Sequence, residues 1–400
     1  MTKDAGAIPV RGTVAPEFEA VGDVFTENFA ERGERGAACA VYYQGEKVVD
    51  LWGGYRDRER TEPWEADTMV LVFSATKGMA AMTVAHARSA GLFDYDDRVA
   101  RYWPAFGAHG KSDVTIRELL AHRAGLPAPP HELSAADVAA TETLADSLAE
   151  LEPEWSPGQE HGYHAFTLGW YESELVRRTD PRGRTLGEYF EEEIAEPNGL
   201  EFYIGVPTGV PDERIAEIDG FGPLKLLFEA REIPWQFYRA LLNPRSLSRR
   251  SLDCFDLDSP GNLASPEYRR VEIPGGNGIG RVRDIARAYG ELATDSSGLG
   301  IGRNTRDELA APAAEPPAGP RDVILKVDAA YSLGYSKPLP GFQFGTGPSA
   351  FGAPGAGGSF AFADPDAELG FAYAPNRMGF RIRDDPRECA LREAVYDCLG

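Results

Sequence analysis

The stretch that decides the fold is Leu71-Val-Phe-Ser74-Ala-Thr-Lys77-Gly-Met-Ala-Ala-Met-Thr-Val-Ala-His-Ala-Arg-Ser-Ala-Gly91. It places Ser74 and Lys77 three residues apart at the start of an alanine-rich helix, and Gly91 is a typical helix stop. Positions i and i+3 share one face of a helix, so the lysine amine can reach the serine hydroxyl. A hydroxyl is a poor nucleophile without such a base. The spacing therefore predicts a nucleophile at Ser74 and its general base at Lys77.

The helix after Lys77 carries apolar side chains on nearly every face, among them Met79, Met82 and Val84. Such a helix is expected in the core, where loss of hydration disfavours the charged form of an amine. The alternative is that Ser74 merely caps a helix and Lys77 is an ordinary residue of its first turn. The S-x-x-K spacing occurs once, on the most apolar helix of the chain, where a lysine without a function would be costly. Its position therefore favours catalysis.

The chain has 400 residues, of which 42% are hydrophobic, and a net charge of −22. These values predict a globular protein with a sizeable core, and the acidic balance argues against nucleic acid and anionic membranes as partners. No apolar run is typical of a secretory signal or a membrane span, so we expect a cytoplasmic protein. The few, widely spaced cysteines predict reduced thiols rather than disulfides or a metal site; they are Cys39, Cys254, Cys389 and Cys398.

Turn signals and hydrophobic periodicity divide the chain into strands near both ends and helices between them. Residues 37–54 predict a hairpin that turns at Gln44-Gly45. Thr115 and Glu118 form a capping-box pattern at the start of a short helix, and Ser134 and Asp137 open another. Further helices are expected at 15–35, 134–151, the end of 163–178, 185–195, 282–293 and the C-terminus, and strands at 329–335, 359–363 and 369–374.

This order predicts one α/β domain built from both termini, residues 1–105 with 265–400, and a mostly helical domain over 106–264. A site is expected in the cleft between them. The glycine-rich run 275–281 fits neither common phosphate-loop pattern, so we interpret it as a turn before a helix. His122 lies in the helix that Thr115 opens, and we expect it to be a hydrogen-bonded structural residue near the site.

Several motifs occur in a fixed order along the chain. They are Phe-Ser-Ala-Thr-Lys-Gly at 73–78, Leu-Leu-Ala-His-Arg-Ala-Gly-Leu-Pro at 119–127, Trp-Ser-Pro-Gly at 155–158, Tyr-His-Ala at 163–165 and Phe-Gly-Ala-Pro-Gly-Ala-Gly-Gly-Ser at 351–359. This order resembles the serine β-lactamase and penicillin-binding-protein superfamily, and within it the class C-like family VIII carboxylesterases. The resemblance implies an α/β β-lactamase/DD-peptidase-like fold, in which a mixed antiparallel sheet is flanked by helices and carries a helical insertion domain.

By this resemblance Ser74 is the nucleophile, Lys77 its base, and Tyr163 the group that passes the proton to the leaving group. The backbone N–H groups of Ser74 and Ala356 are candidates for the oxyanion hole, because acyl transfer needs donors for the oxygen that becomes charged. The substrate is expected to be a small ester or another acyl compound, with no cofactor and no metal. Candidate substrate-binding residues are Trp155, His164, Ala353 and Gly355.

Two positions depart from the family pattern. The tyrosine motif ends in Ala165 rather than asparagine, and the third motif begins with Ala353 where relatives carry lysine, histidine or tryptophan. Both losses remove partners of a penicillin, so they favour a carboxylesterase over a β-lactamase. The alternatives left open are an acyltransferase that uses an alcohol or amine acceptor, whose pocket would come from residues 200–265, and a binding protein that has lost the chemistry. The oligomeric state is not predicted.

Overall fold

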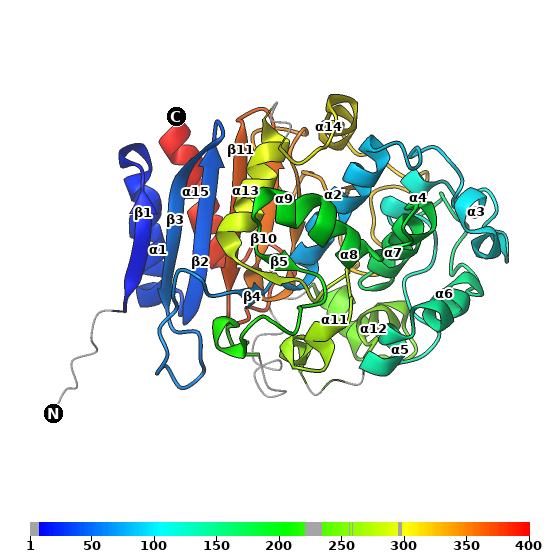
Figure 1. The fold of residues 1–400 in the computed structure, drawn as a ribbon, viewed down its shortest axis with the longest axis horizontal. Coiled ribbons are helices and arrows are strands. Elements are labelled where there is room, and N and C mark those ends of the chain that lie inside the picture. Colours follow the sequence, from blue (N-terminus) through cyan, green and yellow to red (C-terminus); the bar gives the residue numbers. More distant parts are fainter. Residues whose placement is uncertain (1–7, 221–233, 256, 258, 295–297) are drawn as a thin grey trace.

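The computed structural model describes residues 8–220, 234–255, 257, 259–294 and 298–400. Its N-terminal strands lie beside its C-terminal strands in one sheet, and the helices of the middle of the chain lie on the opposite side of the molecule (Figure 1). This arrangement confirms the predicted fold class. The boundaries proposed for the two domains, 1–105 with 265–400 and 106–264, stay a prediction.

The main sheet has eight strands in the order β1-β3-β2-β11-β10-β9-β8-β7, and its described strand pairs are antiparallel. The predicted hairpin is confirmed, because β2 and β3 pair across Gln44-Gly45. The strands are β1 (Val10–Val14), β2 (Gly36–Tyr43), β3 (Glu46–Gly54), β7 (Tyr331–Ser332), β8 (Tyr335–Ser336), β9 (Phe351–Pro354), β10 (Phe360–Asp364) and β11 (Leu369–Pro375).

Large and small residues alternate along β11, and their sizes determine how closely helices can pack on each face of the sheet. Side chains of a strand point alternately to its two faces. Leu369, Phe371 and Tyr373 fill a core with α1 (Glu19–Glu31) and α15 (Pro386–Leu399), which buries Leu391 and Val395. Gly370, Ala372 and Ala374 face the other way. These small residues let α13 (Val282–Ala293), which has the predicted bounds, pack closely on the sheet.

A second, small sheet connects three distant parts of the chain. Its central strand β6 (Ile279–Gly280) pairs with β4 (Val70–Leu71) on one side and with β5 (Phe202–Tyr203) on the other. The glycine-rich run is therefore partly a strand that leads into α13. Because β4 comes just before the Ser74 turn, this sheet fixes the start of the central helix.

The central helix α2 (Thr76–Ser89) is buried along most of its length, as predicted. The capping boxes at Thr115 and Ser134 are confirmed. The stretch 134–151 forms two helices rather than one, because Ala140 leaves the helical conformation with ψ 62°.

The other helices are α3 (Val99–Tyr102), α4 (Ile116–Leu120), α5 (Ala135–Ala139), α6 (Thr141–Ala149), α7 (Thr167–Thr179), α8 (Leu186–Phe190), α9 (Glu196–Asn198), α11 (Trp235–Leu241), α12 (Leu247–Leu252) and α14 (Arg303–Ala310). Among the described residues, no helix is long and apolar enough to cross a membrane.

Candidate active site

Ser74 lies in the short 3-10 turn Phe73–Ala75 that opens α2. Phe73 holds a left-handed backbone conformation with φ 49°, which is uncommon for a residue other than glycine. The Thr76 hydroxyl stabilises this turn by donating to the Phe73 carbonyl at 2.5 Å and accepting from the Gly278 N–H at 2.8 Å. The residue just before strand β6 thus stabilises the turn that presents Ser74.

Lys77 is buried, and its side-chain nitrogen meets three oxygen atoms. The Nζ atom lies 3.2 Å from Ser74 Oγ, and it donates hydrogen bonds to the carbonyl oxygens of Ala165 at 2.5 Å and Gly275 at 2.6 Å. Carbonyl oxygens can only accept, so they fix two N–H groups. In a neutral amine the third direction is the lone pair, which faces the Ser74 hydroxyl. This geometry suits proton abstraction from the serine.

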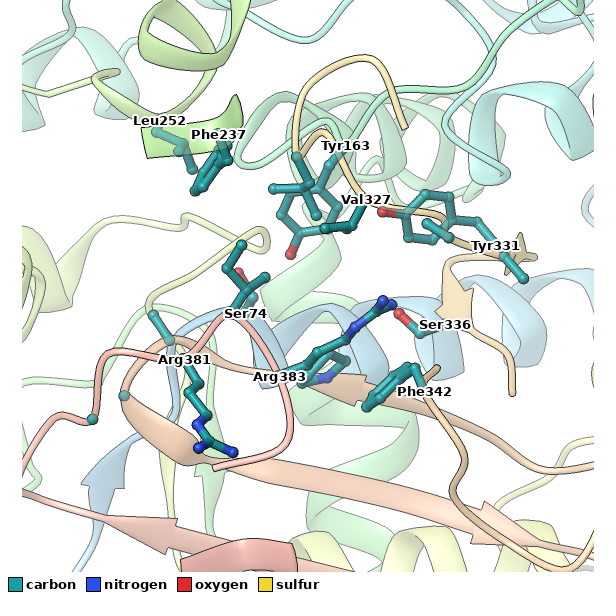
Figure 2. A pocket seen from close by; sticks show the side chains of 18 of the residues that line it. Ser74, Tyr163, Phe237, Leu252, Val327, Tyr331, Ser336, Phe342, Arg381 and Arg383 are labelled. Atoms are coloured by element: carbon teal, nitrogen blue, oxygen red, sulfur yellow. The ribbon is translucent and has the colours of Figure 1, made fainter. Parts of the chain in front are cut away.

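Tyr163 lies next to the pair that Ser74 and Lys77 form. The Lys77 Nζ atom is 4.8 Å from the centre of the Tyr163 ring. Both Tyr163 and Ser74 line the same cavity, and Figure 2 shows the tyrosine hydroxyl on the side where Ser74 lies. The structure therefore brings together the three residues that the sequence predicts to be catalytic.

Asp322 accepts hydrogen bonds that hold Tyr163 in position. This residue was not predicted from the sequence. Its buried carboxylate accepts from the Tyr163 N–H at 2.9 Å and from the Tyr331 hydroxyl at 2.8 Å. The Tyr331 ring stacks on the Tyr163 ring, with centroids 6.1 Å apart. The other carboxylate oxygen accepts from the N–H groups of Ile324 and Leu325, each at 2.7 Å. The network holds Tyr163 by its backbone and its ring.

The candidate oxyanion hole lies where β9 ends beside the Ser74 turn. A Cβ atom on Gly355 would overlap the Val72 carbonyl oxygen, so this close approach requires glycine. The Ser359 hydroxyl donates to the same Val72 oxygen at 2.8 Å. Ala356 is exposed and lines the cavity together with Ser74. The backbone N–H groups of Ser74 and Ala356 thus come from two segments that pack against each other.

The cavity that contains Ser74 has a volume of about 280 Å³. Figure 2 shows Phe237, Leu252 and Val327 across it from the Arg381 and Arg383 loop. Phe237 and Leu252 belong to the 200–265 segment that was expected to supply an acceptor pocket, although 221–233 lie outside the described residues. The apolar lining residues are Phe237, Leu252, Leu325, Val327, Ala329, Ala330, Leu339, Phe342, Pro354, Met378, Phe380 and Ile382.

Three of the predicted substrate-binding residues do not line this cavity. His164 is fully buried, where its Nε2 accepts from the Leu126 N–H at 3.0 Å and its Nδ1 contacts the Gly162 carbonyl at 2.6 Å. Burial lowers the pKa of His164 to about 4. The Trp155 indole donates to the Glu160 carbonyl at 3.1 Å, and Ala353 is buried in β9. Because their side chains are used in packing, we assign these residues structural roles.

Gly355 lines a smaller cavity beside the main one. His122 is a buried residue near the site, as expected, and its Nδ1 accepts from the His164 N–H at 3.0 Å. Burial lowers the pKa of His122 well below the ordinary value for histidine, and the charge of Lys77 acts in the same direction. His122 is therefore neutral at physiological pH and supports the loop that carries Tyr163.

Glu172 on α7 is an unexpected buried acidic residue near Lys77. It has no exposed surface, and neither oxygen of its carboxyl group accepts a hydrogen bond from the described part of the chain. Burial raises the pKa of Glu172 to about 8, although the charge of Lys77 opposes this shift. A buried polar group without a partner costs stability. Nothing in the sequence of α7 distinguishes Glu172 from Glu174, which pairs with Arg177 and Arg178.

Replacing Glu172 by glutamine is expected to stabilise the protein by an amount that grows as pH rises from about 4.5 to about 8. The folded state holds the Glu172 proton more tightly than the unfolded state, so wild type loses about 1.4 kcal/mol per pH unit across this window. The glutamine variant has no ionisable group at position 172, so it does not show this loss. Urea unfolding of both proteins at pH 5, 6.5 and 8 measures the difference, and a difference independent of pH would contradict the assignment. Glu174→Gln, which breaks two ion pairs on the same helix, should instead destabilise.

One cluster of potential metal ligands occurs among the described residues. Ligand atoms of Asp384, Glu388 and Cys389 lie within 4.8 Å of one another. The Arg392 guanidinium donates to Asp384 at 3.1 Å, to Glu388 at 2.7 Å and to the Cys389 sulfur at 3.3 Å. This cation already contacts all three groups, so the cluster has the character of an ion-pair network that anchors α15.

Comparisons with known proteins agree with this fold and site. Residues 21–393 match the family model described as Beta-lactamase. The chain is 33% identical over 383 residues to the esterase/beta-lactamase LipL of Mycobacterium tuberculosis, covering 94% of this chain and 84% of LipL. A crystal structure of a family VIII carboxylesterase superposes with a TM-score of 0.85 at 37% identity, covering 98% of this chain and 100% of that one.

A penicillin-binding-protein homologue from Caulobacter crescentus has a TM-score of 0.83 at 34% identity, with 98% of this chain and 100% of that chain covered. These matches identify the class of protein as one with the fold of serine β-lactamases and penicillin-binding proteins. This chain belongs to the β-lactamase family. Its resemblance to family VIII carboxylesterases, expected from the motifs, is confirmed.

Proposed function

We propose that this protein is a serine carboxylesterase that hydrolyses small carboxylic esters through an acyl-Ser74 intermediate. The observation that carries the proposal is the position of the Lys77 amine, 3.2 Å from Ser74 Oγ and held by two backbone carbonyl groups. The esterase names of LipL and of the family VIII carboxylesterase support it.

In the proposed mechanism, the neutral Lys77 amine takes the hydroxyl proton while Ser74 Oγ forms a bond to the ester carbonyl carbon. The carbonyl oxygen becomes negative and receives hydrogen bonds from the N–H groups of Ser74 and Ala356. The bond between the carbonyl carbon and the alcohol oxygen then breaks, and the Tyr163 hydroxyl gives its proton to the departing oxygen. Lys77 returns a proton to Tyr163. In the second half, water attacks the acyl carbonyl carbon and gives a proton to the Tyr163 and Lys77 pair. The bond between that carbon and Ser74 Oγ then breaks, the carboxylic acid leaves, and the proton returns to Ser74 Oγ.

The differences from the family pattern favour an ester over a penicillin. The Ala165 side chain offers no amide to a substrate, while the backbone carbonyl of this residue is used to hold Lys77. Ala353 is buried in β9 and supplies no cation for the penicillin carboxylate. A binding protein without chemistry is disfavoured, because loss of activity would not preserve a serine and a buried lysine in hydrogen-bonding distance.

Purified protein should release p-nitrophenol from p-nitrophenyl butyrate in an initial burst of about one equivalent per chain, because acylation is expected to precede slower hydrolysis of the acyl group. Turnover should be unchanged by EDTA, since the proposed route uses no metal. Absence of turnover by correctly folded protein would contradict the proposal.

An acyltransferase is the second candidate, because the apolar cavity wall formed by Phe237, Leu252 and Val327 could bind an alcohol or amine in place of water. The same assay separates the two functions when candidate acceptors are added. Butyrylated acceptor in place of butyric acid would identify transfer. Butyric acid as the sole product at saturating acceptor would identify hydrolysis.

A further inference from the structure

Arg383 is a charged residue in a largely apolar part of the cavity. It lies on the loop after β11, is half-buried, and lines the same cavity as Ser74. Its guanidinium lies 5.0 Å from the centre of the Phe342 ring and donates to the Asp328 carbonyl at 3.1 Å. In Figure 2 the side chain extends from its loop toward Ser336, on the side of the cavity where Tyr331 lies.

The carboxylates nearest to Arg383 have other partners. Asp328 faces Arg321 at 3.7 Å, and Asp384 pairs with Arg392 at 3.1 Å. Asp322 is occupied by the tyrosine network described above. Within the described ranges, Arg383 therefore has no carboxylate within ion-pair distance, although all three acids contribute to the electrostatic potential around it.

A guanidinium has five N–H donors in a planar fork that matches a carboxylate. Arg383 uses one of them on a carbonyl and stacks on an aromatic ring. Burial lowers the pKa of Arg383 below its ordinary value, yet a guanidinium stays protonated at working pH. The apolar neighbours Val327, Leu339 and Phe342 keep the local dielectric low, which strengthens an interaction with an anion.

We propose that the active-site cavity takes esters whose acyl group is a short apolar arm ending in a carboxylate, and that Arg383 binds this carboxylate. The inference rests on the proposed function, since it assumes attack by Ser74. The apolar wall suits a methylene arm. A carboxylate fits better than a phosphate, because the Arg383 guanidinium carries one positive charge, and Arg381, the other arginine that lines the cavity, extends away from it (Figure 2). Arg383 is then a specificity residue, which contacts the substrate at a distance from the reacting atoms.

The test compares aryl esters that differ in one charge. The p-nitrophenyl half-esters of adipic and pimelic acid carry the carboxylate, and their ω-methyl esters are neutral matches of nearly the same shape. Wild type should prefer the half-esters. Arg383→Met should lower kcat/KM for the half-esters about 10- to 100-fold, the usual effect of losing a charge-assisted hydrogen bond, and leave the neutral esters within about threefold. Arg383→Lys should retain part of the preference.

Arg303→Met, at a side chain that is 75% exposed, controls for a change in net charge and should leave the preference intact. Equal losses on charged and neutral esters, or no preference in wild type, would overturn the role of Arg383. Failure of wild type to turn over any of the esters would instead count against the esterase function itself. The two failures are therefore distinguishable.

Discussion

Replacement of Ser74 by alanine is expected to lower kcat for ester hydrolysis by on the order of 10⁴-fold or more, because the acyl group then has no oxygen to which it can be transferred. The measurement is turnover of p-nitrophenyl butyrate by matched amounts of both proteins. Alanine is compatible with the 3-10 turn Phe73–Ala75, which already contains Ala75. Unfolding temperature should therefore change little.

Ser336→Ala is the matched control, since Ser336 lines the same cavity, and the Nζ atom of the adjacent Lys337 donates to the Leu309 and Ser349 carbonyl groups rather than to the Ser336 hydroxyl. This variant should keep kcat within about tenfold of wild type, an effect appropriate to a surface contact rather than a nucleophile. Near-wild-type turnover by Ser74→Ala would remove the assignment of the nucleophile. An equal loss of turnover in Ser336→Ala would mean that the loss results from a change in the cavity in general, and not from removal of the Ser74 hydroxyl.

Replacement of Lys77 by arginine is expected to be about as damaging as loss of Ser74. A guanidinium stays protonated at any working pH, so it cannot accept the serine proton, although it keeps the positive charge. Residues that act as one unit are not additive, so the double variant with Ser74→Ala should be little worse than either single one. Steady-state kinetics of Lys77→Arg, Ser74→Ala and the double variant measure these losses in kcat.

Lys111→Arg controls for burying a larger cation. Lys111 is also fully buried and donates to a backbone carbonyl, that of Leu151 at 2.5 Å, but it lies outside the cavity. Its substitution should affect stability more than turnover. Substantial turnover by Lys77→Arg would mean that Lys77 acts only as a charge, and the base would then have to be sought at Tyr163.

The sequence predicts the parts of the site that depend on local geometry. Ser74 and Lys77 are one helical turn apart, so their contact follows from helix periodicity alone. The capping box at Thr115 and the bounds of α13 are also local signals, and both are confirmed. Tyr163 was predicted by resemblance rather than by spacing, because it comes from a different segment.

Long-range contacts could not be predicted in this way. The hydrogen bond from Lys77 to the Gly275 carbonyl joins residues 198 positions apart, and Asp322 meets Tyr163 across 159 positions. Loop side chains have no periodicity that fixes their direction, which is why His164 was expected in the cavity and lies in the core. Glu172 resembles a solvated helix residue until the packing of α7 is known.

Covalent labelling with a fluorophosphonate probe tests the central claim most directly, because the probe reacts with a serine only when a neighbouring base and an oxyanion site activate it. Digestion and mass spectrometry of the labelled protein locate the adduct. We predict one equivalent of label on Ser74 in wild type, and none on Ser74 in Lys77→Arg. An unlabelled, correctly folded wild-type protein, or an adduct on a different residue, would contradict the account.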